Sequence, residues 1–159
     1  MTITRNRPNQ KSSSKPRFML EEQVMVSMAQ TLSDFAVRMS DIIKEYGITM
    51  VHYNVLRILR GAGGNGIPCG TVAERMVNKE PDITRLLDRM EKLELIIRTR
   101  DQSDRRVVIT RISDHGLKVL SNLEAPLKVL HQQQFEGISS EKLEQLSGIV
   151  KEIQAAHAG

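Results

Sequence analysis

Residues 81–112 read PDITRLLDRMEKLELIIRTRDQSDRRVVITRI, and this stretch decides how the chain folds. Its first part carries apolar residues at the spacing of one helical face, namely Ile83, Leu86, Leu87, Met90 and Leu93. Pro81 is placed to begin this helix, because proline is favoured at the first helical position. The opposite face carries Arg85, Asp88, Arg89 and Lys92. The pattern therefore predicts a helix with a buried apolar side and a charged outer side.

Two β-rich runs follow this helix, at 95–100 and 106–112, and a polar turn at 101–105 separates them. Such a pair of runs around a short polar turn predicts a β-hairpin. Before the helix, residues 70–77 predict a shorter helix, and 78–80 form the turn between the two. Two helices joined by a tight turn, with a hairpin directly after them, are typical of a winged helix-turn-helix.

Helical periodicity precedes this unit. Apolar residues recur every three or four positions over 20–46, which predicts one long helix. Thr49 is placed to cap a second helix, and the glycines of 61–66 predict a loop after it. A helix as long as 20–46 cannot bury its whole apolar stripe within so short a chain. Part of the stripe is therefore expected to be a dimer surface.

Two more helices are expected after the hairpin. Ser113 is placed to cap the first, and Pro126 inside it predicts a bend or a break. Its apolar stripe consists of Leu117, Leu120, Leu123, Leu127 and Leu130. Ser139 is placed to cap the last helix, which carries Leu143, Leu146, Val150 and Ile153.

The expected fold is mainly α-helical with a small β-hairpin wing. It is a winged helix-turn-helix flanked by N- and C-terminal dimerisation helices. The expected divisions are a disordered basic tail at 1–17, a dimerisation helix at 18–47, a winged helix-turn-helix at 48–112 and dimerisation helices at 113–157.

The basic charge of the chain is unevenly placed. The 159 residues carry a net charge of +4, but residues 1–17 alone contribute +5 and the remainder is near neutral. The tail is expected to be a flexible terminus, or else an arm that touches nucleic-acid backbone. In the remainder, the segment from Arg98 to Arg111 holds five arginines against Asp101 and Asp104. A local basic stripe of this kind suits a polyanion.

Several classes of protein do not fit the composition. No apolar run exceeds three residues, so no membrane-spanning helix is expected. Cys69 is the single cysteine, which excludes an intramolecular disulfide and a multi-cysteine metal site. No phosphate loop, nucleotide-binding glycine signature or catalytic motif is present, so neither an enzyme nor a cofactor is expected.

Three segments, in this order and spacing, resemble the MarR family of bacterial transcription regulators. They are the helix at 81–92, the turn Asp101-Gln102-Ser103-Asp104-Arg105-Arg106, and Ile112-Ser113-Asp114-His115-Gly116. They are similar to the family's recognition helix, its D-x-x-D-x-R wing and its L-T-x-x-G helix entry. The resemblance extends over about residues 18–156. Glu94 stands where the family usually has a glycine, which leaves the end of this helix open.

The resemblance implies a homodimer that binds a pseudo-palindromic operator, usually as a repressor. It also implies release by a small anionic or phenolic effector, an oxidant or a metal. The histidines show no ligand spacing that would favour a metal. Cys69 could be a redox switch near a helix start, or simply a packed or idle thiol.

The first half of the helix at 81–92 is expected to meet base edges in the major groove. Arg85 suits a guanine there, and its alternative is an exposed ion pair with Asp82. Arg89 is expected to reach a phosphate or to pair with an acid on its own helix. The resemblance implies that Arg106 enters the minor groove and that Asp104 holds it in a bidentate ion pair. The alternative is that these residues form a solvated hairpin tip. The predicted DNA contacts are Asn78, Lys79, Asp82, Thr84, Arg85, Arg89, Asp104, Arg105 and Arg106.

The sequence indicates the effector site less clearly than the DNA contacts. The resemblance places it between the dimerisation helices and the winged domain, near Phe35, Met39, His52, Tyr53 and Leu56. A histidine and a tyrosine beside methionines could hold an aromatic carboxylate. The alternatives are that the methionines belong to the core and that His52 satisfies a backbone carbonyl.

The sequence thus predicts a homodimeric, sequence-specific DNA-binding regulator, a repressor released from its operator by a small anionic or aromatic effector. Its expected partners are double-stranded DNA and a second copy of the chain, with no membrane, in the cytoplasm of a bacterium or archaeon. The alternative is a winged-helix protein-interaction module that no longer binds DNA. Arginines at positions 85, 89, 105 and 106 disfavour that alternative, because such a module would carry acidic or apolar residues there.

Overall fold

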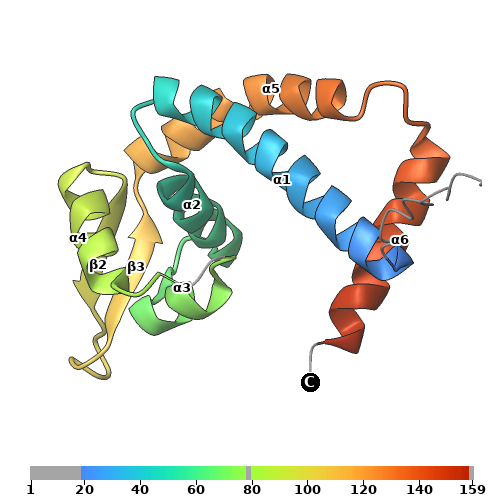
Figure 1. The fold of residues 1–159 in the computed structure, drawn as a ribbon. Coiled ribbons are helices and arrows are strands. Elements are labelled where there is room, and N and C mark those ends of the chain that lie inside the picture. Colours follow the sequence, from blue (N-terminus) through green and yellow to red (C-terminus); the bar gives the residue numbers. More distant parts are fainter. Residues whose placement is uncertain (1–18, 78–79, 158–159) are drawn as a thin grey trace, which may run out of the picture. The chain divides into compact units, whose positions relative to one another are not determined.

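A computed structural model describes residues 19–77 and 80–157, and it has the expected mainly helical fold with a small sheet (Figure 1). The tail at 1–17 and the turn residues Asn78 and Lys79 lie outside the described residues. The helices are α1 (Leu20–Glu45), α2 (Met50–Ala62), α3 (Cys69–Arg75), α4 (Ile83–Lys92), α5 (Asp114–Gln134) and α6 (Ser140–Ala156). The strands are β1 (Ile67–Pro68), β2 (Ile96–Arg100) and β3 (Val108–Ile112). None of the described helices is long and apolar enough to cross a membrane.

The chain divides into two compact units at the middle of α1. The first unit ends at Asp34, and its described residues form the N-terminal part of α1 with every side chain exposed. The second unit, from Phe35 onward, holds the hydrophobic core.

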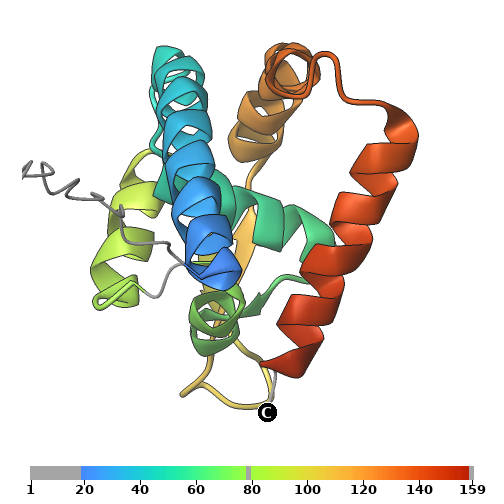
Figure 2. The ribbon, with the colours of Figure 1, turned by 45° about the vertical axis from the view of Figure 1, so that its right-hand side comes forward.

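The core is built around α2, which contacts α3, β3 and α5 (Figure 2). Thr49 caps α2 as predicted: its side chain accepts from the His52 backbone N–H at 3.3 Å. Each surrounding helix turns its apolar stripe toward α2. The fully buried side chains include Val55, Leu56 and Leu59 of α2, Leu87 and Met90 of α4, and Leu123 of α5. This burial fixes which side of α4 remains at the surface.

The sheet has three antiparallel strands in the order β1-β3-β2. The predicted hairpin is β2 and β3, with Arg98 opposite Thr110. Strand β1 was not predicted, because two residues with a proline carry no alternating pattern. Gly66 precedes it with φ 71°, and a Cβ at this position would lie 2.5 Å from the carbonyl oxygen of Thr110. Glycine therefore allows β1 to approach β3.

The start of α4 corrects one prediction. Pro81 does not begin the helix; Asp82 caps it and accepts from the Arg85 backbone N–H at 3.0 Å. A side-chain acceptor at the cap fixes the start one residue after itself. Leu93, predicted to be buried, is 47% exposed because α4 ends there and the chain turns away. Glu94 adopts φ 57°, so the helix ends in the left-handed conformation without a glycine.

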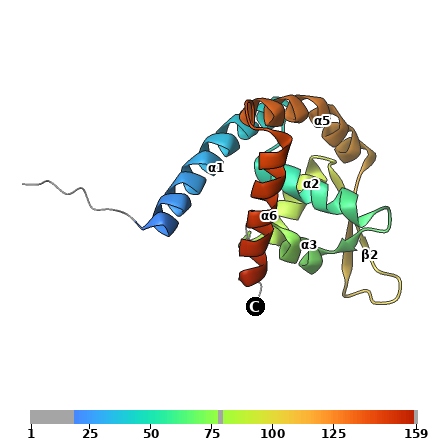
Figure 3. The ribbon, with the colours of Figure 1, turned by 90° about the vertical axis from the view of Figure 1, so that its right-hand side faces the viewer.

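Smaller differences concern other helix ends. Gly61 and Ala62 belong to α2, which ends at Gly63 with φ 79°, so the predicted loop is shorter. Ser113 and Ser139 cap α5 and α6 as predicted. Helix α5 runs continuously through Pro126, which excludes a break there (Figure 3). Leu117 lies at the edge of the α5 stripe and is 39% exposed.

Candidate DNA-binding surface

Helix α4 presents a polar outer face. Its apolar residues pack inward, so Thr84, Arg85 and Arg89 remain exposed. Arg85 Nε lies 3.0 Å from Asp82 Oδ2, which is the exposed ion pair considered from the sequence. The Arg85 side chain is nevertheless 80% exposed, and exposed ion pairs of this kind are weak. Arg85 can therefore exchange this partner for another anion at little cost.

Arg98 does not belong to the exposed basic stripe, although the sequence places it there. Its guanidinium extends from β2 toward α4, where Nη2 lies 2.5 Å from Asp88 Oδ1 and 2.7 Å from Glu91 Oε2. Its Nε donates to Glu91 Oε2 at 3.0 Å, and its backbone N–H donates to Glu91 Oε1 at 3.3 Å. The hydrogen bond to Glu91 is the largest cause that raises the pKa of Arg98. The sequence did not predict this cluster. Asp88 and Glu91 are three residues apart on one helix face, but nothing in that spacing indicates that their partner lies on a strand.

The turn of the wing is ordered by Asp101. Its Oδ1 accepts from the Ser103 hydroxyl at 2.5 Å, the Ser103 N–H at 2.8 Å and the Asp104 N–H at 3.0 Å. These hydrogen bonds hold the pKa of the Asp101 carboxyl below its ordinary value, and the one from the Ser103 hydroxyl contributes most. The turn is thus closed by its own side chain, as Asx turns are.

The predicted ion pair between Asp104 and Arg106 is wrong for the described chain. Asp104 Oδ1 accepts from the backbone N–H of Arg106 at 2.9 Å, and no ion pair joins the two side chains. A backbone amide two residues away is nearer to a turn aspartate than the end of a long side chain. The Arg105 and Arg106 side chains are both exposed at the wing tip.

The predicted effector residues are not gathered in one place. Leu56 is fully buried in the core, and His52 is buried while its Nδ1 accepts from the Thr49 backbone N–H at 3.4 Å. Phe35 packs edge-on against Phe135, with ring centroids 5.5 Å apart. Met39 and Tyr53 both line a hollow of about 220 Å³ between α1, α2 and the end of α3. The structure therefore brings together only this last pair.

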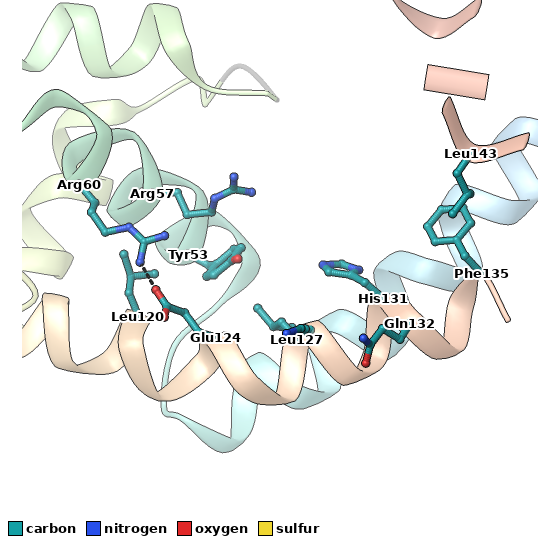
Figure 4. A pocket seen from close by; sticks show the side chains of 11 residues that line it. Tyr53, Arg57, Arg60, Leu120, Glu124, Leu127, His131, Gln132, Phe135 and Leu143 are labelled. Carbon is teal, nitrogen blue, oxygen red and sulfur yellow. Dashed lines mark hydrogen bonds and ion pairs between the residues drawn. The ribbon is translucent and has the colours of Figure 1, made fainter. Parts of the chain in front are cut away.

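A larger cleft of about 670 Å³ lies between α2, α5 and the start of α6. Figure 4 shows Tyr53, Arg57 and His131 facing it, with Arg60 Nη1 bound to Glu124 Oε1 at 2.6 Å. Lys128 also lines the cleft, and apolar cover comes from Leu127 and Phe135. The signal in the sequence was the pairing of Arg57 with Arg60 and of Lys128 with His131. Each pair is three residues apart and so lies on one helix face.

Cys69 is the first residue of α3 and is partly buried, with Sγ 3.2 Å from Thr110 Oγ1. This contact favours the packed interpretation of the thiol. Within 19–77 and 80–157, no group of three or more histidine, cysteine or acidic side chains could hold a metal ion.

The comparisons with known proteins identify the architecture. Residues 48–108 match the MarR family profile. A MarR transcription factor from Planctomyces limnophilus, known from its crystal structure, is 31% identical with a TM-score of 0.65; the match covers 85% of this chain and 98% of that protein. The chain belongs to the MarR family. It is therefore a DNA-binding transcription regulator and not an enzyme.

Two further transcription regulators are similar to this chain. The HTH-type transcriptional repressor MdtR of Bacillus subtilis is 25% identical over 86% of this chain and 87% of its own length. The organohalide-sensing regulator RdhR-CbdbA1625 has the same fold, with a TM-score of 0.78 at 20% identity. That match covers 99% of this chain and 90% of that one, whose structure is of a 2,4-dichlorophenol-bound form.

Proposed function

We propose that this MarR-family regulator is a homodimeric repressor that binds a pseudo-palindromic operator and leaves it when a small effector binds. One observation carries the DNA-binding part of the proposal. Arg85 and Arg89 on α4 and Arg105 and Arg106 on the wing keep exposed side chains, while the charge of Arg98 is bound internally. Two neighbouring elements of one unit thus offer cations to a polyanion.

The proposed contacts follow the two grooves of DNA. Asp82, Thr84 and Arg85 at the start of α4 face base edges in the major groove, with Arg89 and the turn residues Asn78 and Lys79 on the backbone. At the wing tip, Arg106 enters the minor groove and Arg105 binds phosphate. Asp104 shapes the turn by accepting from the Arg106 backbone N–H.

Dimerisation is supported by apolar residues that the described chain leaves about half exposed or more. Helix α6 has no buried residue, and Leu146, Ile149 and Ile153 are 45–54% exposed. In the first unit, Leu20, Met25 and Leu32 of α1 are 62–72% exposed. Exposed apolar surface on this scale is typical of an interface. A dimer would place two copies of α4 in major grooves about 34 Å apart.

The cleft between α2, α5 and α6 supports an effector that is anionic, aromatic or both. Arg57, Lys128 and His131 offer positive charge or hydrogen-bond donors, and Tyr53 and Phe135 offer ring faces. Of the residues proposed from the sequence, only Tyr53 lines this cleft. Repression is supported by the name of the MdtR relative, and a small aromatic ligand by the dichlorophenol bound to RdhR-CbdbA1625.

Fluorescence anisotropy with DNA from upstream of the protein's own gene, at several salt concentrations, tests the proposal. Selective binding with a steep negative salt slope is expected. Arg106→Ala should weaken binding and reduce the slope by about one unit, because one phosphate-region cation is lost. Lys151→Ala removes the same charge from α6 and should leave both unchanged. Equal affinity for operator and random DNA would contradict the proposal.

A further inference from the structure

Arg98 joins the recognition helix to the wing. Its guanidinium and its backbone N–H together make four hydrogen bonds to Asp88 and Glu91 in the second half of α4. The side chain is only 19% exposed, whereas both acids are about half exposed. A planar guanidinium held by two carboxylates has little freedom to rotate. The contact therefore fixes β2 against α4 in position and in angle.

The charges around Arg98 are not those of a DNA contact. Two carboxylates face one guanidinium, so the cluster carries a net negative charge. In the described chain, the other arginines of the wing, at positions 100, 105, 106 and 111, form no ion pair with a carboxylate. The fold thus commits one arginine of the wing to an internal partner and leaves the rest at the surface.

Arg98 also lines one hollow together with residues of both elements proposed to bind DNA. This hollow of about 370 Å³ is lined by Thr84 from α4, by Arg106 from the wing tip and by Arg98 from β2. Because β2 contacts α4, a change in this contact would move the wing tip relative to the start of α4. A major-groove contact and a minor-groove contact can form together only at a suitable separation.

We propose that Arg98 is a positioning residue of the DNA-binding surface, which sets the spacing between α4 and the wing without touching DNA. This inference rests on the proposed contact of Arg106. It predicts an effect on DNA affinity opposite to the one expected from charge alone: the acids that hold Arg98 should favour DNA binding although they repel the phosphates.

The decisive variant is the double substitution Asp88→Asn and Glu91→Gln. Removing two negative charges beside a polyanion site strengthens binding if electrostatics alone operates. If the acids hold the wing in place through Arg98, the double variant should instead bind operator about tenfold more weakly. Arg98→Gln should show a similar loss, and Arg98→Lys a smaller one. Arg38→Gln removes one arginine charge at an exposed position of α1 and should cause no loss.

Hydrogen exchange of the full-length protein gives a second readout that needs no DNA. Amides of β2 and β3 should exchange faster in Arg98→Gln and in the double variant, while those of α2 remain as in the wild type. A double-mutant cycle completes the test: Arg106→Ala should weaken binding much less in the Arg98→Gln protein than in the wild type.

Tighter operator binding by the double variant would overturn the inference, as would unchanged exchange in the wing. Full additivity of Arg98→Gln and Arg106→Ala, with a salt slope reduced by about one unit for Arg98→Gln, would instead make Arg98 a direct DNA contact. Failure of the proposed Arg106 contact can be distinguished from failure of the inference about Arg98. In that case Arg106→Ala alone binds like the wild type, and the exchange experiment still decides whether Arg98 positions the wing.

Discussion

The Ser113 hydroxyl donates a hydrogen bond of 2.5 Å to the carbonyl oxygen of Glu94. Glu94 is the left-handed residue at the end of α4, and Ser113 caps α5 by accepting from the Gly116 N–H at 2.9 Å. The Ser113 N–H also donates to the carbonyl oxygen of Leu95 at 3.2 Å. One buried residue therefore ties the end of α4 to the beginning of α5.

Ser113→Ala should lower the free energy of unfolding by about 1–2 kcal/mol, because it removes a helix cap and leaves a carbonyl oxygen without its donor. Urea unfolding followed by circular dichroism measures this change. Ser113→Thr keeps the hydroxyl and should lose less than half as much. Equal stability of Ser113→Ala and the wild type would show that water replaces both hydrogen bonds.

Gly116→Ala should destabilise the same junction by a different mechanism. A Cβ at this position would overlap the carbonyl oxygen of Leu95 and would press on Leu56 in the core at 3.1 Å. Because backbone cannot yield as a side-chain tip does, a loss of about 1–3 kcal/mol is expected. Gly148→Ala on α6, where a Cβ meets nothing within 4 Å, is the matched control and should be neutral or stabilising.

The sequence predicted the winged helix-turn-helix well because its elements are amphipathic or capped. Leu86, Leu87 and Met90 are spaced for one helical face and are buried as predicted. Thr49 and Ser113 could be read as caps because a cap is a local interaction. The boundary at Pro81 was misplaced because the rule for proline competed with the capping side chain of Asp82.

Contacts between distant segments could not be predicted from the sequence. Arg98 and Glu91 are seven residues apart on different elements, and nothing local distinguishes Arg98 from the exposed arginines of the wing. Tyr53 and Phe135 line the same cleft, and they do so because α5 packs on α2, which no local pattern in the sequence indicates. The predicted pair of Asp104 and Arg106 failed because a nearby backbone amide competes for the carboxylate.

Acidification should destabilise the protein through His52. Burial, and after it the charge of Arg89, lowers the pKa of His52 from its ordinary value of 6.5. The unfolded chain therefore binds a proton more readily, so stability should be complete above pH 6.5 and should fall as the pH drops below it. A protonated Nδ1 also cannot accept from the Thr49 N–H.

Urea midpoints at pH 7.5 and pH 5.5 test this dependence on His52. His52→Gln is the control, because glutamine at this position of a capping box can accept the same N–H and does not titrate. The loss of stability between the two pH values should be smaller in His52→Gln than in the wild type. An identical loss in both proteins would assign the acid sensitivity to other groups.

Helix α6 should carry part of the dimer interface, and Ile149→Lys tests it. Ile149 is 54% exposed in the single chain, beside the exposed Leu146 and Ile153. In a two-fold interface each substitution occurs twice, and burying one isoleucine contributes roughly 1.5–3 kcal/mol. Two unpaired lysines in place of two isoleucines should therefore weaken the dimer by more than about a hundredfold.

Light scattering over a range of protein concentrations should then show monomers where the wild type shows dimers. Ser147→Lys adds the same charge at an exposed polar position on another side of α6 and should leave the dimer intact. If Ile149→Lys remains dimeric at every concentration, this face of α6 lies outside the interface, and the exposed stripe of α1 becomes the surface that must hold the two copies together.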